Sequence, residues 1–246
     1  MRARLAMIIG LLLTLGCLLS PAAAQAPRPS SPMILALGST SWLNASDVQA
    51  ATGAVVKQDM GQFQLKDFAV IVLANVAFAG LPGPVQQGLV EYVNNGGGVL
   101  ITGGSQSFGS GGYQAVASII PFQIRTTSDW RPIPFRSPVP IQPGHPILSG
   151  VTFLTVGAVN DMNPRPDASE ILQTAGGGSA AGRAAGSSGG GGFFPLPLIA
   201  EVGAGAGRVI GIASDLNDFA GMRDRDLFVR NTITYLVRAS RMGPAR

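Results

Sequence analysis

The sequence predicts one α/β domain, in which a mostly parallel β-sheet has helices on both faces. Two observations lead to this fold class. Residues 69–76 (AVIVLANV) form an almost uninterrupted apolar run, as expected of a central parallel strand that is covered on both sides. Residues 81–98 then show a helical pattern and residues 99–102 a second apolar strand, so residues 69–102 predict a strand–helix–strand unit with a right-handed crossover.

The helix within residues 81–98 has a recognisable beginning, face and end. Pro84 suits the first turn, where a missing N–H group removes no helical hydrogen bond. Apolar side chains at helical spacing predict the buried face, at Val85, Leu89, Tyr92 and Val93. Residues 94–96 (NNG) supply a stop signal.

Elements are also predicted on both sides of this unit. Before it we expect a strand, a short helix and a strand, at residues 33–37, 44–52 and 54–58. Asn44 or Ser46 is expected to cap that helix and Gly53 to end it. Near the C-terminus, residues 224–241 predict a closing helix, with Val229, Ile233, Leu236 and Val237 along its buried side.

Residues 195–215 (PLPLIAEVGAGAGRVIGIASD) predict two strands joined by a glycine turn. The sequence GAGAGR at residues 203–208 superficially resembles a dinucleotide-binding loop. It leads into a strand and not into a helix, so we expect a hairpin turn there.

The middle of the chain is less regular. Residues 114–120 and 122–127 suggest a helix and a strand, and residues 168–174 another strand. Six prolines within residues 130–146 predict an irregular excursion and not a core strand. Residues 176–192 consist almost entirely of Gly, Ala and Ser and predict a flexible surface loop.

Residues 1–24 have the layout of a secretory signal peptide, because Arg2 and Arg4 precede an apolar run that ends in small residues. An uncleaved N-terminal membrane anchor and a lipid anchor on Cys17 remain alternatives. The run is short for a spanning helix, and the sequence around Cys17 fits a lipoprotein signal poorly. We expect an exported bacterial protein, periplasmic or extracellular, with a Pro/Ser-rich leader at residues 25–32 and one domain at residues 33–241.

Charge and cysteine content exclude several classes of protein. Loss of Arg2 and Arg4 with the signal peptide lowers the net charge from +4 to +2, and no dense Lys/Arg cluster predicts a nucleic-acid partner. Cys17 is the only cysteine, so the mature chain has no disulfide, thiolate metal site or cysteine nucleophile. The aspartates near the C-terminus match no calcium loop, and we expect neither a metal nor another cofactor.

Residues 96–113 (GGGVLITGGSQSFGSGGY) place a short strand between two glycine clusters. Ligands of open parallel sheets bind at the carboxyl ends of the strands, and residues 103–106 occupy the place of a nucleophile elbow. Residues 92–113, with the later segments GHPILSGV, GAGAGRVIGIASD and FVRNTITYLV, resemble the predicted glutamine amidotransferase domain of the class I glutamine amidotransferase-like superfamily, as found in exported or membrane-attached bacterial proteins. The resemblance covers most of residues 33–238 and implies a flavodoxin-like fold with a reactive elbow after strand 99–102.

Active members of that superfamily use a cysteine at the elbow, with a histidine and a carboxylate downstream. This sequence has Gly103, Gly104 and Ser105 there, so glutamine hydrolysis by the family mechanism is not expected. Our first hypothesis is a non-catalytic domain that binds a small ligand or an envelope partner. The backbone N–H groups from Gly103 to Gln106 would donate to a carbonyl or anionic oxygen.

Two alternatives stay open. Ser105, Asp129 and His145, the only histidine, follow the chain order of α/β-hydrolase triads and suggest a serine hydrolase, although the last glycine of G-x-S-x-G is missing. The other alternative is a structural module of an envelope assembly that docks through the proline-rich residues 130–146.

Five further residues are candidates for the ligand site. Asp215 follows a strand at its carboxyl end and is expected to border the same site as Ser105, and Asp161 is a similar candidate. Phe108, Tyr113 and Trp130 are predicted to form an apolar wall of the site or, alternatively, part of the core.

Overall fold

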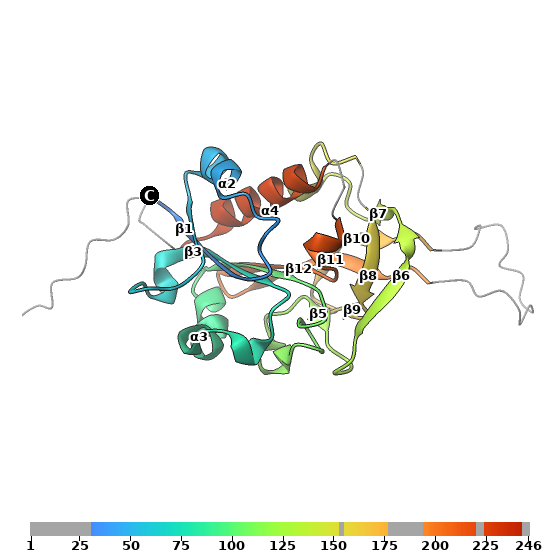
Figure 1. The fold of residues 1–246 in the computed structure, drawn as a ribbon, viewed down its shortest axis with the longest axis horizontal. Helices are drawn as coiled ribbons and strands as arrows, with labels where there is room; N and C mark the ends of the chain where they lie inside the picture. The colour runs from blue at the N-terminus through green and yellow to red at the C-terminus, as the bar shows by residue number, and fades with distance from the viewer. Residues whose placement is uncertain (1–30, 153–154, 177–193, 220–223, 243–246) are drawn as a thin grey trace, which may run out of the picture.

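The computed structural model describes residues 31–152, 155–176, 194–219 and 224–242 of the 246-residue chain (Figure 1). The predicted signal peptide lies outside these ranges, as do all but the last two residues of the leader and all but Gly176 of the glycine-rich segment. Within the described ranges, no helix is both long and apolar enough to span a membrane.

The fold is built on a sheet of eight strands in the order β2-β1-β3-β4-β12-β11-β10-β7. The first five strands in this order are parallel, namely β2 (Val55–Lys57), β1 (Met33–Gly38), β3 (Phe68–Ala74), β4 (Gly98–Thr102) and β12 (Gly207–Ile212). The other three pair antiparallel, namely β11 (Pro197–Ala204), β10 (Ser169–Thr174) and β7 (Pro138–Pro140). The predicted α/β class with a mostly parallel, flavodoxin-like sheet is confirmed, and β11 and β12 form the predicted hairpin.

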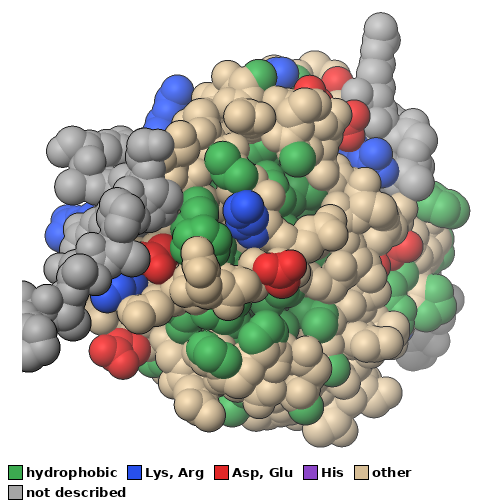
Figure 2. Space-filling model, turned by 60° about the vertical axis from the view of Figure 1, so that its left-hand side comes forward, with side chains coloured by type: hydrophobic (Ala, Val, Ile, Leu, Met, Phe, Trp, Pro, Cys, Tyr) green, Lys and Arg blue, Asp and Glu red, His purple; other side chains and the backbone are tan. Residues whose placement is uncertain are grey.

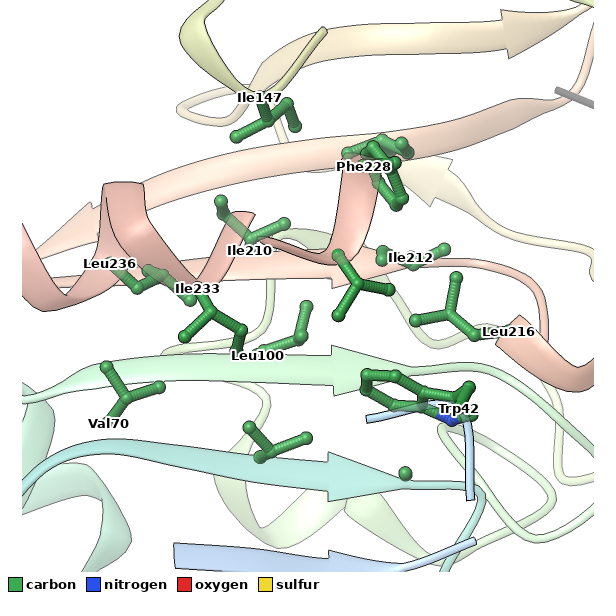
Figure 3. Close-up of a cluster of buried hydrophobic side chains, with 14 of the residues drawn as sticks. Trp42, Val70, Leu100, Ile147, Ile210, Ile212, Leu216, Phe228, Ile233 and Leu236 are labelled. Atoms are coloured by element: carbon green, nitrogen blue, oxygen red, sulfur yellow. The ribbon is translucent and has the colours of Figure 1, made fainter. Parts of the chain in front are cut away.

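Helices cover both faces of this sheet (Figure 1). Helix α3 (Gly83–Asn94) lies on one face, and helices α2 (Ala45–Thr52) and α4 (Arg225–Ala239) lie on the other. The apolar faces predicted for α3 and α4 are buried. Figure 3 shows the α4 side of the core, where Ile233 and Leu236 pack toward Val70, Leu100 and Ile210 of three neighbouring strands.

The structure decides which of Asn44 and Ser46 caps helix α2. Asn44 is its N-cap, and its side chain accepts from the N–H groups of Ser46 at 3.1 Å and Asp47 at 3.4 Å. Gly53 ends the helix with a φ of +70°, a left-handed conformation that favours glycine.

The proline-rich excursion is more regular than its composition predicts. Residues 130–146 contribute β6 (Trp130–Arg136) and β7, which pair with β8 (Val156–Asn160) and β10. The prediction of irregular structure was therefore wrong for these strands. Each of them has only one partner strand in the described part of the chain, so a proline facing the free side removes no ladder hydrogen bond.

Other predictions for the middle of the chain hold only in part. The helix expected at residues 114–120 is a single 3₁₀ turn, Tyr113–Val116, and the strand expected at residues 122–127 shortens to β5 (Phe122–Gln123). Strands β8 and β9 (Asn163–Pro164) were not predicted. Further 3₁₀ turns lie at Leu65–Asp67, Phe78–Gly80, Pro146–Leu148 and Leu216–Phe219.

Hydrophobic side chains also reach the surface on the side of the molecule near β1 and α3, between charged ones (Figure 2). A groove of about 350 Å³ beside α3 is lined in large part by such side chains, including Met60, Phe63, Leu65 and Met242.

The parallel strands end at one common edge of the sheet. Because β1, β3, β4 and β12 run in the same direction, the segments that follow them lie together: residues 39–42, 75–77, 103–112 and 213–218. Ser105 and Asp215, both predicted from the sequence to border one site, belong to these segments.

Candidate functional site

The elbow after β4, residues 103–106, is held in place by hydrogen bonds that its backbone N–H groups donate to other parts of the protein. Three of its four N–H groups donate to acceptors within the protein: Gly103 to the carbonyl oxygen of Ile212 at 2.7 Å, Gly104 to Asn160 Oδ1 at 2.9 Å, and Gln106 to Asn75 Oδ1 at 2.9 Å. Only the N–H of Ser105 has no acceptor among the described residues. The expected row of free N–H groups is therefore not present, because the chain uses most of them to fix the turn.

Asn75, the first residue after β3, joins the elbow to Asp215. Its Oδ1 accepts from the N–H of Gln106, and its Nδ2 donates to Asp215 Oδ2 at 2.8 Å. The other oxygen of Asp215 accepts from the backbone and side-chain nitrogens of Asn217, at 2.9 and 3.0 Å. Asp215 is buried and orients Asn75, so it supports the elbow indirectly, through the Asn75 side chain.

Asn160 makes the equivalent connection on the other side of the elbow. Its Oδ1 accepts from the N–H of Gly104, and its Nδ2 donates to the Gly104 carbonyl oxygen at 3.2 Å and to Asp129 Oδ1 at 3.0 Å. Asp129 also accepts from the N–H of Gly109 at 2.9 Å and from the hydroxyl of Ser110 at 2.8 Å. Asn160 and Asp129 are both buried.

Two amide–carboxylate pairs, Asn75–Asp215 and Asn160–Asp129, thus clamp Gly104 and its neighbours. We call these four side chains, with Gly104, the elbow network. Each pair presents an amide oxygen to one elbow N–H, and each amide is oriented by a buried carboxylate.

The glycines of the elbow are required by this close packing. A Cβ atom at Gly104 would lie 2.2 Å from the Asn75 side chain, and Gly104 has a φ of +133°. A Cβ atom at Gly103 would lie 2.5 Å from Asn160 Oδ1. The density of glycine after β4 is therefore explained by the approach of two asparagine side chains to the backbone.

Backbone strain is concentrated around the elbow. Asn75 has a φ of +42° and Phe108 a φ of +48°, and these are the only non-glycine residues with positive φ in the described chain. Asparagine tolerates this region better than most residues, whereas a bulky aromatic residue rarely adopts it. The side chain of Asn75 is hydrogen-bonded to Gln106 of the elbow, and Phe108 follows the elbow in the sequence.

Buried polar atoms without partners gather at the same edge of the sheet. Within the described chain, four buried side-chain atoms lack a hydrogen-bond partner, and three of them belong to Trp42, Thr102 and Asp218, at or after the carboxyl ends of β1, β4 and β12. Burial, together with the nearby charge of Asp215, raises the pKa of the Asp218 carboxyl group above its usual value. Such unpaired groups are few in native proteins, and each requires an explanation.

His145 belongs to a different group of side chains, on the α4 face of the sheet. Its Nε2 lies 3.0 Å from Glu201 Oε2, its Nδ1 accepts from the N–H of Ile147 at 3.4 Å, and its ring packs against Tyr235 with centroids 5.1 Å apart. Glu201 also accepts from Arg208 and, at 2.8 Å, from the Tyr235 hydroxyl. We call His145, Glu201, Arg208 and Tyr235 the histidine cluster.

The histidine cluster has the features of a structural ion-pair group. Burial, followed by the hydrogen bond and negative charge of Glu201, raises the pKa of Tyr235 to about 12, so the phenol stays a neutral donor. Glu201 is only 8% exposed, and its partners come from β12, α4 and the segment before Pro146. The cluster therefore ties three separate segments to β11.

The structure does not assemble the serine hydrolase triad considered from the sequence. Asp129 is bonded to Asn160, Gly109 and Ser110, and both ring nitrogens of His145 have other partners. Ser105 is exposed and forms no hydrogen bond with either residue in the described structure. A nucleophile elbow also leads into a helix, whereas residues 103–112 form successive turns.

The other predicted site residues divide into exposed and buried groups. Ser105 and Gln106 are exposed. Phe108 and Tyr113 are fully buried and pack with Phe122 and Phe78, so they belong to the core and not to the wall of a site. Asp161 faces Arg125 and Arg131, each at 3.1 Å, and not the elbow. The part of the chain that is described contains no cluster of three His, Cys, Asp or Glu side chains that could hold a metal ion.

Sequence reasoning missed the two asparagines that hold the elbow. Asn75 ends the apolar run AVIVLAN, and its position directly after a central strand was a usable signal. Asn160 ends β8, a strand that the sequence did not predict, so its place opposite Gly104 had no such signal.

No model of a known protein family matches this sequence, and no curated protein matches it. The fold is similar to that of two cytoplasmic proteins from Salmonella typhimurium. For one, from strain LT2, the TM-score is 0.61 at 14% identity over 83% of this chain and 99% of that chain. For the other, it is 0.60 at 15% identity over 83% and 97%.

A protein from Bacteroides uniformis, described as ThuA-like, is similar with a TM-score of 0.51 at 13% identity, over 86% of this chain and 94% of that chain. This chain shares its fold with ThuA-like proteins. That fold is related to the fold of the class I glutamine amidotransferases, which agrees with the resemblance seen in the sequence. At such identities the likeness concerns the fold alone.

Proposed function

We propose that this chain is a non-catalytic binding domain that takes a small polar ligand at the elbow, residues 103–106. The proposal depends above all on the concentration of backbone strain at Asn75 and Phe108. Strain of this kind costs about 1–3 kcal/mol per residue and is found most often at ligand sites and switches. The unpartnered atoms of Trp42, Thr102 and Asp218 at the same edge support the location.

The groups available to a ligand are few and polar. Ser105 and Gln106 are exposed, and the N–H of Ser105 has no acceptor within the described chain. A carbonyl or anionic oxygen of the ligand would accept from this N–H, and the Ser105 hydroxyl and Gln106 amide would complete its hydrogen bonds. The elbow network holds these groups in place, which lowers the entropy lost on binding.

The absence of catalysis is part of the proposal. Any side chain at Gly104 would collide with Asn75, and His145 is bonded within the histidine cluster. We also propose that the chain derives from the predicted glutamine amidotransferase domains that its sequence resembles. Its fold, related to theirs, supports this descent, and its elbow lacks their cysteine.

We propose export on the basis of residues 1–24 alone. The two Salmonella typhimurium proteins are described as cytoplasmic, but their likeness to this chain bears on fold and not on location. Expression of the full chain in a Gram-negative host, followed by fractionation and N-terminal sequencing, tests this point. A mature N-terminus near Gln25 in the periplasm is expected, and an intact Met1 in the cytosol would contradict it.

Binding at the elbow can be tested with a blocked variant and a matched control. Wild-type residues 25–246 would be screened by thermal shift against small carboxylates and amides, together with any molecule extracted from the purified protein. Ser105→Trp fills the elbow, whereas Ser118→Trp changes another exposed serine. We expect the thermal shift caused by the ligand to be lost in Ser105→Trp and kept in Ser118→Trp. A shift retained in Ser105→Trp would place the ligand elsewhere and contradict the proposal.

A fluorophosphonate probe separates binding from the serine hydrolase alternative. No labelling of folded wild-type protein is expected. Labelling that both Ser105→Ala and His145→Ala abolish would show an activated serine and overturn the non-catalytic assignment. A structural module that docks through residues 130–146 would give neither labelling nor a ligand that depends on Ser105.

A further inference from the structure

A second polar site lies at the end of the molecule that contains β6, β8 and β10 (Figure 1). It is a groove of about 440 Å³, and the side chains that define its chemistry are Arg125, Arg131, Arg136, Asp161, Asn163 and Phe194. We call it the arginine groove. Neither the elbow network nor the histidine cluster contributes a residue to it.

The charge of the arginine groove is unbalanced. Of the described residues that line it, three are arginines and only Asp161 is acidic. Asp161 accepts from Arg125 through Oδ1 and from Arg131 through Oδ2, each at 3.1 Å. One carboxylate thus holds two guanidinium groups close together, and Arg125 and Arg131 exceed the charge of Asp161 by one.

The arginines of this groove keep donors for a ligand. The side chains of Arg125 and Arg131 are 48% and 44% exposed, and Asp161 uses few of the five N–H donors of each guanidinium group. A planar guanidinium group matches the oxygen spacing of phosphate and can bind it through two parallel hydrogen bonds. Arg136 is fixed through Nη1, which donates to the Ala175 carbonyl oxygen at 2.9 Å.

Asp161 itself has a fixed position. Its backbone N–H donates to the Asp129 carbonyl oxygen at 2.7 Å, and it directly follows Asn160, which is buried against the elbow. The two arginines are therefore oriented by a residue that directly follows β8 and is held by this backbone hydrogen bond. A site with preorganised donors loses less entropy on binding than one with mobile side chains.

From this geometry we propose that the arginine groove binds a small phosphate monoester, with its dianionic phosphate on the N–H donors of Arg125 and Arg131 that Asp161 does not use. The organic part of the ester lies against Phe194 and the neighbouring prolines of the groove. Phe194 is 84% exposed, and an apolar ligand group that covers it removes a large apolar surface from water. This site is distinct from the elbow and does not depend on the function proposed for it.

The test uses phenyl phosphate and inorganic phosphate as probes. Both would be titrated into residues 25–246 at low salt, with binding followed by calorimetry or NMR. Saturable binding of phenyl phosphate is expected, tighter than that of inorganic phosphate. Arg125→Gln and Arg131→Gln should each weaken it about tenfold, the typical effect of losing a charged hydrogen bond.

Two controls keep this test specific. Arg230→Gln removes an exposed arginine outside the groove and should leave the affinity unchanged. Phe194→Ala should weaken phenyl phosphate and not inorganic phosphate, a difference that no loss of folding would produce. No saturable binding by wild type up to about 10 mM, or equal weakening by Arg230→Gln, would overturn the proposal.

Discussion

The elbow network and the histidine cluster are both built from buried polar side chains, yet they hold different things in place. In the elbow network, neutral amides stand between backbone N–H groups and carboxylates, so side chains fix a backbone turn. In the histidine cluster, the charged Glu201 binds the side chains of His145, Arg208 and Tyr235 directly. The first group fixes the backbone of one turn through side chains, and the second joins the side chains of four segments to one another.

Because of this difference, we expect substitutions in the two groups to affect different properties, namely global stability and ligand binding. A change in the histidine cluster removes contacts between β11, β12, α4 and the His145 segment, so we expect its cost to appear in global unfolding. A change in the elbow network alters a turn that the rest of the fold does not depend on to the same extent. Its clearest effect is expected on ligand binding.

Glu201→Ala is expected to have the largest effect on stability. It leaves His145 and Arg208 without their common acceptor in a site where Glu201 is 8% exposed, and breaking such a pair costs about 3 kcal/mol. Urea unfolding measures this loss, and Glu91→Ala, at an exposed glutamate, is the matched control. A loss below about 1 kcal/mol would mean that the partly exposed Arg208 is resolvated and that the cluster matters little.

Gly104→Ala is expected to cost about 2 kcal/mol and to abolish binding at the elbow, because the new Cβ displaces Asn75 and the backbone φ is positive. Gly80→Ala, where a Cβ meets nothing within 4 Å, is the control. Adding Asn75→Gly should recover part of the stability, so the double variant loses less than the sum of the single variants. Additive losses would show that Asn75 is not the obstacle.

Asp218→Asn is expected to have the smallest effect on stability. Asp218 lies close to Asp215 of the elbow network. Because burial and Asp215 raise its pKa, the folded protein holds this proton more tightly than the unfolded chain does. Stability is therefore lost as pH rises from the usual Asp pKa of 3.8 to the raised folded value.

The variant removes this loss, so its melting temperature at pH 7 should exceed that of wild type by at most about 2 °C, since solvent screens the partly exposed group. At pH 3 the difference should disappear. Asp59→Asn, at an exposed aspartate, is the matched control. An equal gain at both pH values would exclude the proton as its cause.

The parallel half of the fold could be predicted because its signals are local. The apolar run at residues 69–76, the single apolar face of α3 and the glycine after α2 each determine structure within a few neighbours. The half that contains β6 to β9 could not be predicted in the same way. Its prolines are tolerated only because the strands lie at edges, and edge position depends on the whole sheet.

The candidate site shows the same division. The position of the elbow follows from the strand order, so Ser105 and Asp215 were placed at the correct edge. Hydrogen-bond partners that lie far apart in the sequence could not be predicted from it. His145 binds Glu201, 56 positions away, and Asp129 binds Asn160, 31 positions away, whereas chain order alone had grouped both with Ser105.

The contact between Gly104 and Asn75 also constrains the evolution of this protein. A cysteine or serine at position 104 would occupy the space of the Asn75 side chain. Replacing Asn75 first would remove its bonds to Gln106 and Asp215 before any nucleophile is gained. Each single step is costly, and the positive φ of Gly104 disfavours a side chain even after both changes, so mutation and selection acting one residue at a time have no easy route from this elbow to a reactive one.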